Sequence, residues 1–168
     1  MTARLSRATI LVTGMSGTGK STALAELARR GHHVVDPDDP GWIVRAETPP
    51  GTEPMWDLDR VGGLLNRHRA GWLSVSGCVA NQGALYDRFD AVVLLTAPVD
   101  VILDRVSGRA NPFGSRPQDR AKIASDLATF EPLLRAGADH EIAATGPLTE
   151  VVAALEEIAA AVDGRRGF

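Results

Sequence analysis

Residues 14–21, GMSGTGKS, combine three glycines, a lysine and two serines between an apolar run and a helix-like run. They fit the pattern G-x-x-x-x-G-K-[ST], in which a glycine-rich turn points successive backbone N–H groups at phosphate oxygens. Lys20 is one of two lysines beside sixteen arginines, which indicates a need for a compact charge that reaches β- and γ-phosphates. A plain turn with a surface lysine is the alternative. We predict a phosphate site formed by Gly14, Ser16, Gly17, Thr18, Gly19, Lys20, Ser21 and Thr22.

Composition limits the classes of protein to consider. With 168 residues, 44% of them hydrophobic and 23% charged, we expect one domain over residues 1–168 with a core of its own. The net charge of −3 gives no reason to expect a nucleic-acid partner. The N-terminal apolar run, residues 9–12, is too short for a signal peptide or a membrane span. The single cysteine, Cys78, fits a reducing compartment, so we expect a cytoplasmic monomer or homodimer.

Short apolar runs alternate with stretches of helical spacing. The pattern predicts strands over residues 8–12, 33–36, 72–76, 91–95 and 140–143. It predicts helices over 21–30, from a cap at Asp57 up to Gly71, and over 99–107, 118–136 and 148–162. Pro132 is expected to kink or restart its helix. Residues 110–117 are expected to be a loop, 37–54 the longest irregular stretch and 164–168 a frayed tail.

This alternation predicts βαβ units, and therefore an α/β fold with a parallel sheet and helices on both of its faces. Missing motifs narrow the class further. No N-K-x-D sequence, the base-reading motif of GTPases, occurs in the chain. Neither residues 72–76 nor 91–95 end in the Asp-Glu pair expected of motor, transporter or chaperone ATPases. Acidic residues instead follow the second predicted strand, in VVDPDDPGW, residues 34–42.

The chain resembles the small P-loop kinases, the group of the shikimate, gluconate and nucleotide kinases. The resemblance rests on residues 14–21, on the D-x-D of Asp36 and Asp38, and on the arginine-bearing strings ILDRVSGR and SRP. RANPFG and PLLRAGADHEI are also similar to strings of AAA-type ATP-binding proteins described as shikimate-kinase-like. The resemblance implies a three-layer P-loop nucleoside triphosphate hydrolase fold with a five-stranded parallel sheet. It further implies phosphoryl transfer from ATP, with Mg²⁺, to a small acceptor, a lid near 109–117 and an acceptor-binding region near 37–70.

Carried onto this sequence, the resemblance assigns roles to the acidic residues. Asp36 would hold Mg²⁺ through water, beside the Ser21 hydroxyl. Asp38 would bind the acceptor hydroxyl or remove its proton, which suits an alcohol because transfer needs charge neutralisation, positioning and a nearby base. A turn of solvated acids, favoured by Pro37 and Pro40, is the alternative.

The arginines of the two strings receive roles in the same way. Arg109 and Arg116 would close on the γ-phosphate from the lid, stabilise the transferred charge and exclude water, and so act with Lys20 and Asp38 in catalysis. Arg105 would bind ATP, or would form an ion pair with Asp104 on a helix face. Because arginine is this chain's general surface cation, a surface role is the alternative for each.

The acceptor pocket is expected after the third predicted strand, in SVSGCVANQG, residues 74–83. Gly77 matches the glycine-rich turn that lines this pocket in the resembling kinases. Cys78 departs from the several glycines of shikimate kinases, which counts against shikimate as the acceptor; a nucleophilic role is disfavoured, since a lone cysteine of this kind usually packs. Asn81 and Gln82 would donate to a polar acceptor or satisfy backbone groups of the turn.

Further residues of the acceptor side lie in or just after the proline-rich stretch. Arg45 and Arg60 would clamp a carboxylate or phosphate of the acceptor. Trp56 would stack on a ring or pack in the core. HEIAATGPL, residues 140–148, resembles the strand and loop that contact adenine in these kinases.

Three functions stay open on the sequence. The leading one is a kinase that phosphorylates a hydroxyl of a metabolite, nucleoside or antibiotic-like molecule. A nucleoside monophosphate kinase is favoured by Arg45 and Arg60, whereas Asp38 would repel an acceptor phosphate. The third is an ATP-binding regulatory module without catalysis.

Overall fold

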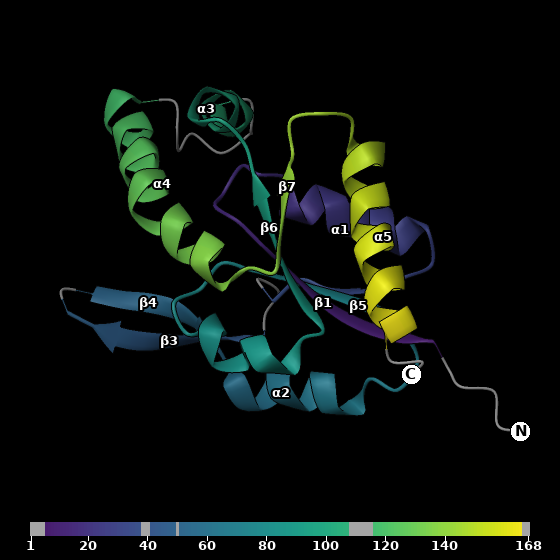
Figure 1. The fold of residues 1–168 in the computed structure, drawn as a ribbon. Coiled ribbons are helices and arrows are strands. Elements are labelled where there is room, and N and C mark those ends of the chain that lie inside the picture. The colour runs from purple at the N-terminus through teal and green to yellow at the C-terminus, as the bar shows by residue number, and fades with distance from the viewer. Residues whose placement is uncertain (1–5, 38–40, 50, 108–115, 166–168) are drawn as a thin grey trace, which may run out of the picture.

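The computed structural model describes residues 6–37, 41–49, 51–107 and 116–165. Its main sheet has five parallel strands in the order β2-β5-β1-β6-β7 (Figure 1). They are β1 (Arg7–Thr13), β2 (His33–Val35), β5 (Gly71–Gly77), β6 (Ala91–Thr96) and β7 (His140–Ala143). The predicted α/β fold with a five-stranded parallel sheet is therefore confirmed.

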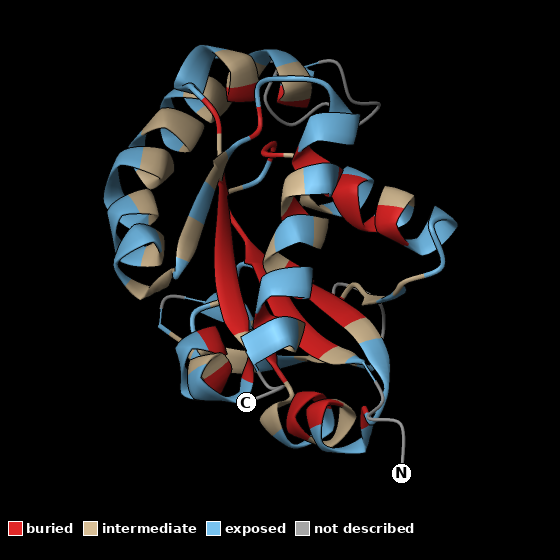
Figure 2. Ribbon diagram, turned by 45° about the vertical axis from the view of Figure 1, so that its right-hand side comes forward, coloured by how far each residue is buried: buried red, intermediate tan, exposed pale blue. Residues whose placement is uncertain are grey.

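Helices cover both faces of this sheet, because the apolar residues of its central strand alternate between two cores. Ile10 and Val12 of β1 pack with α1 (Lys20–Arg29) and α5 (Leu148–Arg165), whereas Leu11 packs with α2 (Leu58–Arg67) and the 3₁₀ helix η1 (Gln82–Arg88). Figure 2 shows the buried strands at the centre and the exposed outer surfaces of the helices. The helix–sheet–helix layers predicted from the sequence are thus present.

All five strands point their carboxyl ends to one edge of the sheet. Strand β1 lies between β5 and β6. The chain continues from β1 to β2 on one side of the sheet and from β6 to β7 on the other, so the strand order reverses at this point. In open α/β sheets, ligands bind at such a switch point beyond the carboxyl ends of the strands. Residues 14–19 follow β1, and Asp36 follows β2, at this edge.

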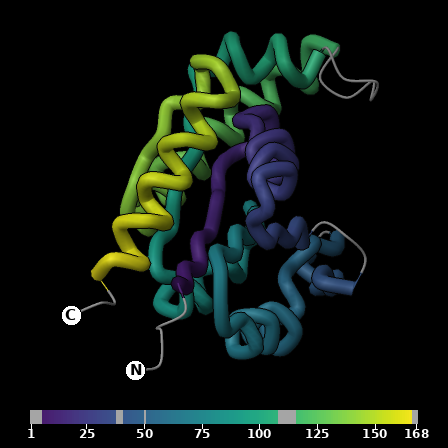
Figure 3. The backbone as a smooth tube through the Cα atoms, turned by 90° about the vertical axis from the view of Figure 1, so that its right-hand side faces the viewer, coloured from purple at the N-terminus to yellow at the C-terminus, as the bar shows by residue number. Residues whose placement is uncertain are grey.

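The expectation of an irregular stretch over residues 37–54 is wrong. It contains an antiparallel hairpin of β3 (Ile43–Thr48) and β4 (Gly51–Trp56), in which Ile43 pairs with Trp56 and Arg45 with Pro54. A proline lacks the N–H for a sheet hydrogen bond but is tolerated in a strand with an open edge. In Figure 3 the hairpin and α5 lie on opposite sides of β1.

The helices differ from the prediction at their ends. Helix α3 (Val99–Ser107) begins and ends as predicted, whereas α4 (Pro117–Gly137) runs through Pro132 as one helix and does not restart there. Pro117 begins α4, a position that needs no N–H donor. Helix α5 includes Gly164 and Arg165, which were expected to fray.

Other element boundaries also differ from those predicted from the sequence. Helix α2 ends at Arg67, before the predicted end, and η1 was not predicted. The lid prediction falls mostly on residues 108–115, outside the described residues, as does the rest of the predicted tail, 166–168. Within the described part of the chain, no helix is both long and apolar enough to cross a membrane.

Candidate nucleotide and acceptor site

The turn after β1 has the backbone geometry of a phosphate-binding loop. Gly17 and Gly19 adopt φ values of 88° and 93°, a left-handed conformation that favours glycine. A Cβ on Gly14 would lie 2.6 Å from the backbone oxygen of Leu95, so the loop packs directly on the end of β6. Gly19 precedes α1 without any side-chain cap, which leaves the first N–H groups of α1 for an anion.

The Lys20 ammonium group lies over this loop. Its Nζ donates to the backbone oxygens of Gly14 at 2.5 Å and Met15 at 3.1 Å. Thr18 is 1% exposed, and its hydroxyl donates to the same Met15 oxygen at 2.8 Å, which closes the turn. Ser16, in contrast, is exposed. The structure therefore brings the predicted lysine to the loop whose N–H groups would hold phosphate.

The two predicted magnesium ligands are in direct contact. Ser21 Oγ, in the first turn of α1, donates to Asp36 Oδ2 at 3.1 Å, and Asp36 directly follows β2. Hydroxyl and carboxylate oxygens are the ligands that Mg²⁺ prefers, and such ions usually keep several waters while binding substrate phosphates. The donor set at the start of α1 therefore fits the ion.

A cavity of about 300 Å³ opens beside the loop. Arg105 of α3 reaches into it, where its guanidinium donates to the backbone oxygens of Gly17 at 3.2 Å and Ala144 at 2.5 Å. It thus joins the loop to the segment after β7, within the string predicted to contact adenine. The cavity is lined by Gly17, Thr18, Gly19, Thr22, Arg105, Ala144, Gly146, Leu148 and Val151.

The predicted arginines of the acceptor side are exposed. Arg45 lies on β3, and Arg60 lies in the first turn of α2, where it donates to the backbone oxygen of Gly41. Arg60 borders a cavity of about 560 Å³ with Trp42, Asp57, Asp59 and Arg67. Arg67 was not predicted, although it follows Arg60 by two helical turns on α2.

Comparison with known proteins identifies the family. A family model described as an AAA domain matches residues 10–124 of the chain. The chain belongs to this AAA domain family. No curated protein matches it.

Several solved structures of kinases share the fold of this AAA domain. A shikimate kinase from Acinetobacter baumannii, in complex with shikimate, has a TM-score of 0.62 at 18% identity over 92% of this chain and 93% of that chain. A shikimate kinase from Bacteroides thetaiotaomicron has a TM-score of 0.61 at 17% identity, over 90% and 97%. A gluconokinase from Sinorhizobium meliloti 1021 has a TM-score of 0.55 at 24% identity, over 96% and 94%. At these identities the likeness shows the fold, and it confirms the predicted fold of the small P-loop kinases.

Some predicted site residues of this AAA domain lie outside the described part of the chain. Asp38 and Arg109 are among them, so their predicted roles stay predictions. Arg116 is described: it directly precedes α4 and is exposed.

Trp56 and Asn81 are hydrogen-bonded to each other. Trp56 is 1% exposed in the core, so its ring is not open to stacking with a ligand in this structure, and the expectation that it packs in the core is the one that holds. The Asn81 side-chain amide accepts from the backbone N–H of Trp56 at 3.0 Å and donates to the Trp56 backbone oxygen at 2.9 Å. The expected polar contact of Asn81 is therefore made to β4 in this structure. Cys78, expected to pack, is exposed after β5.

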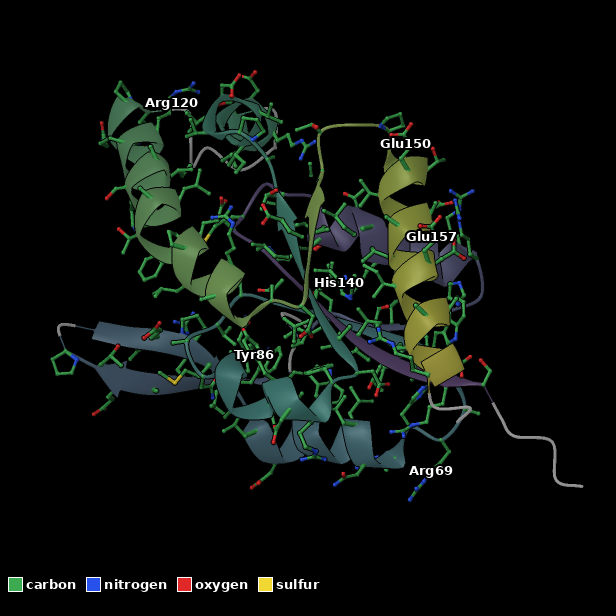
Figure 4. The ribbon with its side chains drawn as sticks, viewed as in Figure 1. Arg69, Tyr86, Arg120, His140, Glu150 and Glu157 are labelled. Atoms are coloured by element: carbon green, nitrogen blue, oxygen red, sulfur yellow. The ribbon has the colours of Figure 1, made fainter. Side chains whose placement is uncertain are left out.

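Gln82 joins the end of β1, directly before the phosphate loop, to η1, a link that the spacing of residues did not indicate. It is 2% exposed, and its Nε2 donates to Thr13 Oγ1 at 3.0 Å and to the Tyr86 hydroxyl at 2.9 Å. Figure 4 shows Tyr86 on η1 near the end of α4, and a Cβ on Gly137 would lie 2.5 Å from the Tyr86 ring. Gln82 also accepts from the Val79 N–H at 3.0 Å, which is the turn contact that the sequence offered as one of its two roles.

Gly77 makes room for Trp56, so its replacement has a predictable cost. A Cβ at this position would lie 2.4 Å from Trp56 Cζ2. Gly77→Ala is expected to lower the free energy of unfolding by about 1–3 kcal/mol through overpacking. Urea unfolding monitored by tryptophan fluorescence measures this effect. Gly83→Ala is the matched control, because a Cβ there meets nothing within 4 Å; equal stability of both variants would contradict the packing.

Proposed function

We propose that this protein transfers the γ-phosphoryl group of ATP to a hydroxyl group of a small molecule, with Mg²⁺. The observation that carries the proposal is the contact of Ser21 Oγ with Asp36 Oδ2 at 3.1 Å, beside Lys20 and the uncapped start of α1. Phosphoryl transfer depends on positioning and charge neutralisation, and this arrangement supplies oxygen ligands, a cation and N–H donors in one place.

ATP would bind along the loop and the cavity beside it. The N–H groups of residues 14–19 and the Lys20 ammonium would hold the phosphates. The cavity bordered by Arg105, Ala144 and Gly146 would take the nucleoside end. Mg²⁺ would be held by Ser21 and Asp36, and it would neutralise charge on the phosphates.

The acceptor would bind at residues 37–70 and beside the end of β5. Asp38 would bind the acceptor hydroxyl or take its proton, and Arg109 and Arg116 would close over the γ-phosphate. Arg45 and Arg60 would hold an anionic group of the acceptor. The fold supports this division, since the kinases that share it include one with bound shikimate and a gluconokinase.

Consumption of ATP by the purified protein tests the proposal. Separate pools would contain sugar acids and polyols, nucleosides, nucleoside monophosphates, and aminoglycoside- or phenicol-type compounds. We expect Mg²⁺-dependent turnover in one hydroxyl-bearing pool and its loss with excess EDTA. ATP binding without turnover in any pool would indicate a regulatory module instead.

Asp38→Asn separates a hydroxyl acceptor from a phosphate acceptor. A hydroxyl needs the carboxylate as a partner or base, so we expect turnover to be largely lost. A phosphate acceptor is already anionic and needs no base, so retained turnover with a nucleoside monophosphate would favour that alternative.

A further inference from the structure

The indole N–H of Trp56 is buried without a hydrogen-bond partner among the described residues. Trp56 is the last residue of β4 and 1% exposed. Buried donors in native proteins nearly always have a partner, since an unpaired one loses its hydration and gains nothing in return. The exception therefore needs an explanation.

Contacts to Asn81, Phe89 and Gly77 fix the position of Trp56. The Asn81 amide bonds both backbone groups of Trp56, and the Phe89 ring lies 6.4 Å away between centroids. The missing side chain of Gly77 lets the indole approach, since a Cβ there would lie 3.1 Å from Cε2, the ring carbon bonded to Nε1. The N–H therefore lies close to the last residue of β5.

This position is at the ligand-binding edge of the sheet. Gly77 pairs with Thr13, the residue directly before the phosphate loop. Neighbouring strands lie only about 5 Å apart, so the indole is one strand away from the start of the loop. The donor without a partner therefore lies within the edge of the sheet at which a phosphoryl acceptor would bind.

We propose that the Trp56 N–H donates a hydrogen bond to an oxygen atom of the acceptor. This inference rests on the proposed function, because it assigns the group beside the phosphate loop to the acceptor. An indole N–H only donates, so the acceptor carries, besides its reacting hydroxyl, a second oxygen that accepts: a carbonyl, ether, hydroxyl or carboxylate oxygen. An ammonium group cannot occupy this position. Since the N–H is covered here, the contact forms when the elements around the end of β5 part to admit the acceptor.

Nuclear magnetic resonance of the indole groups tests this contact without knowledge of the acceptor. The chain has three tryptophans, and Trp42→Phe and Trp72→Phe assign the Trp56 signal by elimination. Acetate, glycerol and methylammonium are added in turn to the ¹⁵N-labelled protein with Mg²⁺ and ADP. Trp72 is the internal control, because its N–H already donates to Asp163 at 3.3 Å.

We expect acetate or glycerol to move the Trp56 proton downfield, with Trp72 unchanged and methylammonium without effect. If neither oxygen probe moves the Trp56 signal, or if methylammonium moves it equally, the proposed hydrogen bond to the acceptor is refuted. The indole N–H would then be bonded to a buried water or have no partner.

Trp56→Phe provides the kinetic test, since it keeps the apolar ring and removes the N–H. With an acceptor that the wild type phosphorylates, KM for the acceptor should rise about two- to tenfold, the range for one neutral hydrogen bond, with KM for ATP unchanged. The preference for that acceptor over an analogue lacking the second oxygen should disappear. Retained preference would refute the proposal. If the wild type phosphorylates nothing, the proposed function fails, whereas the resonance experiment still decides the contact.

Discussion

Lys20→Ala is expected to lower ATP turnover by about 10²–10³-fold, the loss typical of removing one positioned group that stabilises transition-state charge. The Lys20 Nζ donates to the backbone oxygens of Gly14 and Met15 in the loop. Those contacts place the ammonium where phosphate oxygens would replace the carbonyls as partners. Steady-state release of ADP with the acceptor found in the pool assay measures the effect.

Lys122→Ala is the matched control, because Lys122 is the only other lysine of the chain. It lies exposed on α4 and pairs with Asp126 at 2.6 Å. Exposed ion pairs of this kind contribute little, so turnover should stay within about twofold of the wild type. If Lys20→Ala kept wild-type turnover, the loop would not be the phosphate site.

The sheet could be predicted from the sequence because central parallel strands are buried on both faces. Their apolar runs, such as residues 91–95, are continuous and bounded by polar turns. The hairpin could not be recognised, because Pro54 and the glycines of its region indicate loops, and only pairing of β3 with β4 makes them strands. The short η1 has too few residues for a helical period to show.

The phosphate loop could be predicted because its chemistry is local: one run of eight residues supplies the turn, the cation and the hydroxyl. The residues predicted for an acceptor pocket, in contrast, are held by contacts between distant parts of the chain. Asn81 bonds a backbone 25 positions away, and Gln82 bonds Thr13, 69 positions away. From the sequence alone, a side chain such as Asn81 or Gln82 could equally contact a ligand or another part of the chain. Only the folded structure shows which of these contacts it makes.

Asp36→Asn is the second change with a large expected effect. It removes the charge of a predicted metal ligand and keeps its shape and an oxygen that can still accept from Ser21 Oγ. We expect turnover at fixed Mg²⁺ to fall about 10- to 100-fold, as for other groups that hold or orient a metal. Because the loss concerns ion binding, raising the Mg²⁺ concentration should restore part of the activity. Titration of turnover against Mg²⁺ measures this shift, and Asp126→Asn on α4 serves as the control.

A double-mutant cycle of Asp36→Asn with Ser21→Ala shows whether the two residues act on one ion. If both hold the same Mg²⁺, the first substitution already loosens the ion, so the second costs less than it does alone. Residues that act independently would instead give losses that add in free energy. Additive losses, together with an unchanged Mg²⁺ requirement, would limit the contact at 3.1 Å to the support of α1 against β2. A coupled loss that excess Mg²⁺ reduces requires a shared ion, because a structural hydrogen bond has no dependence on the metal concentration.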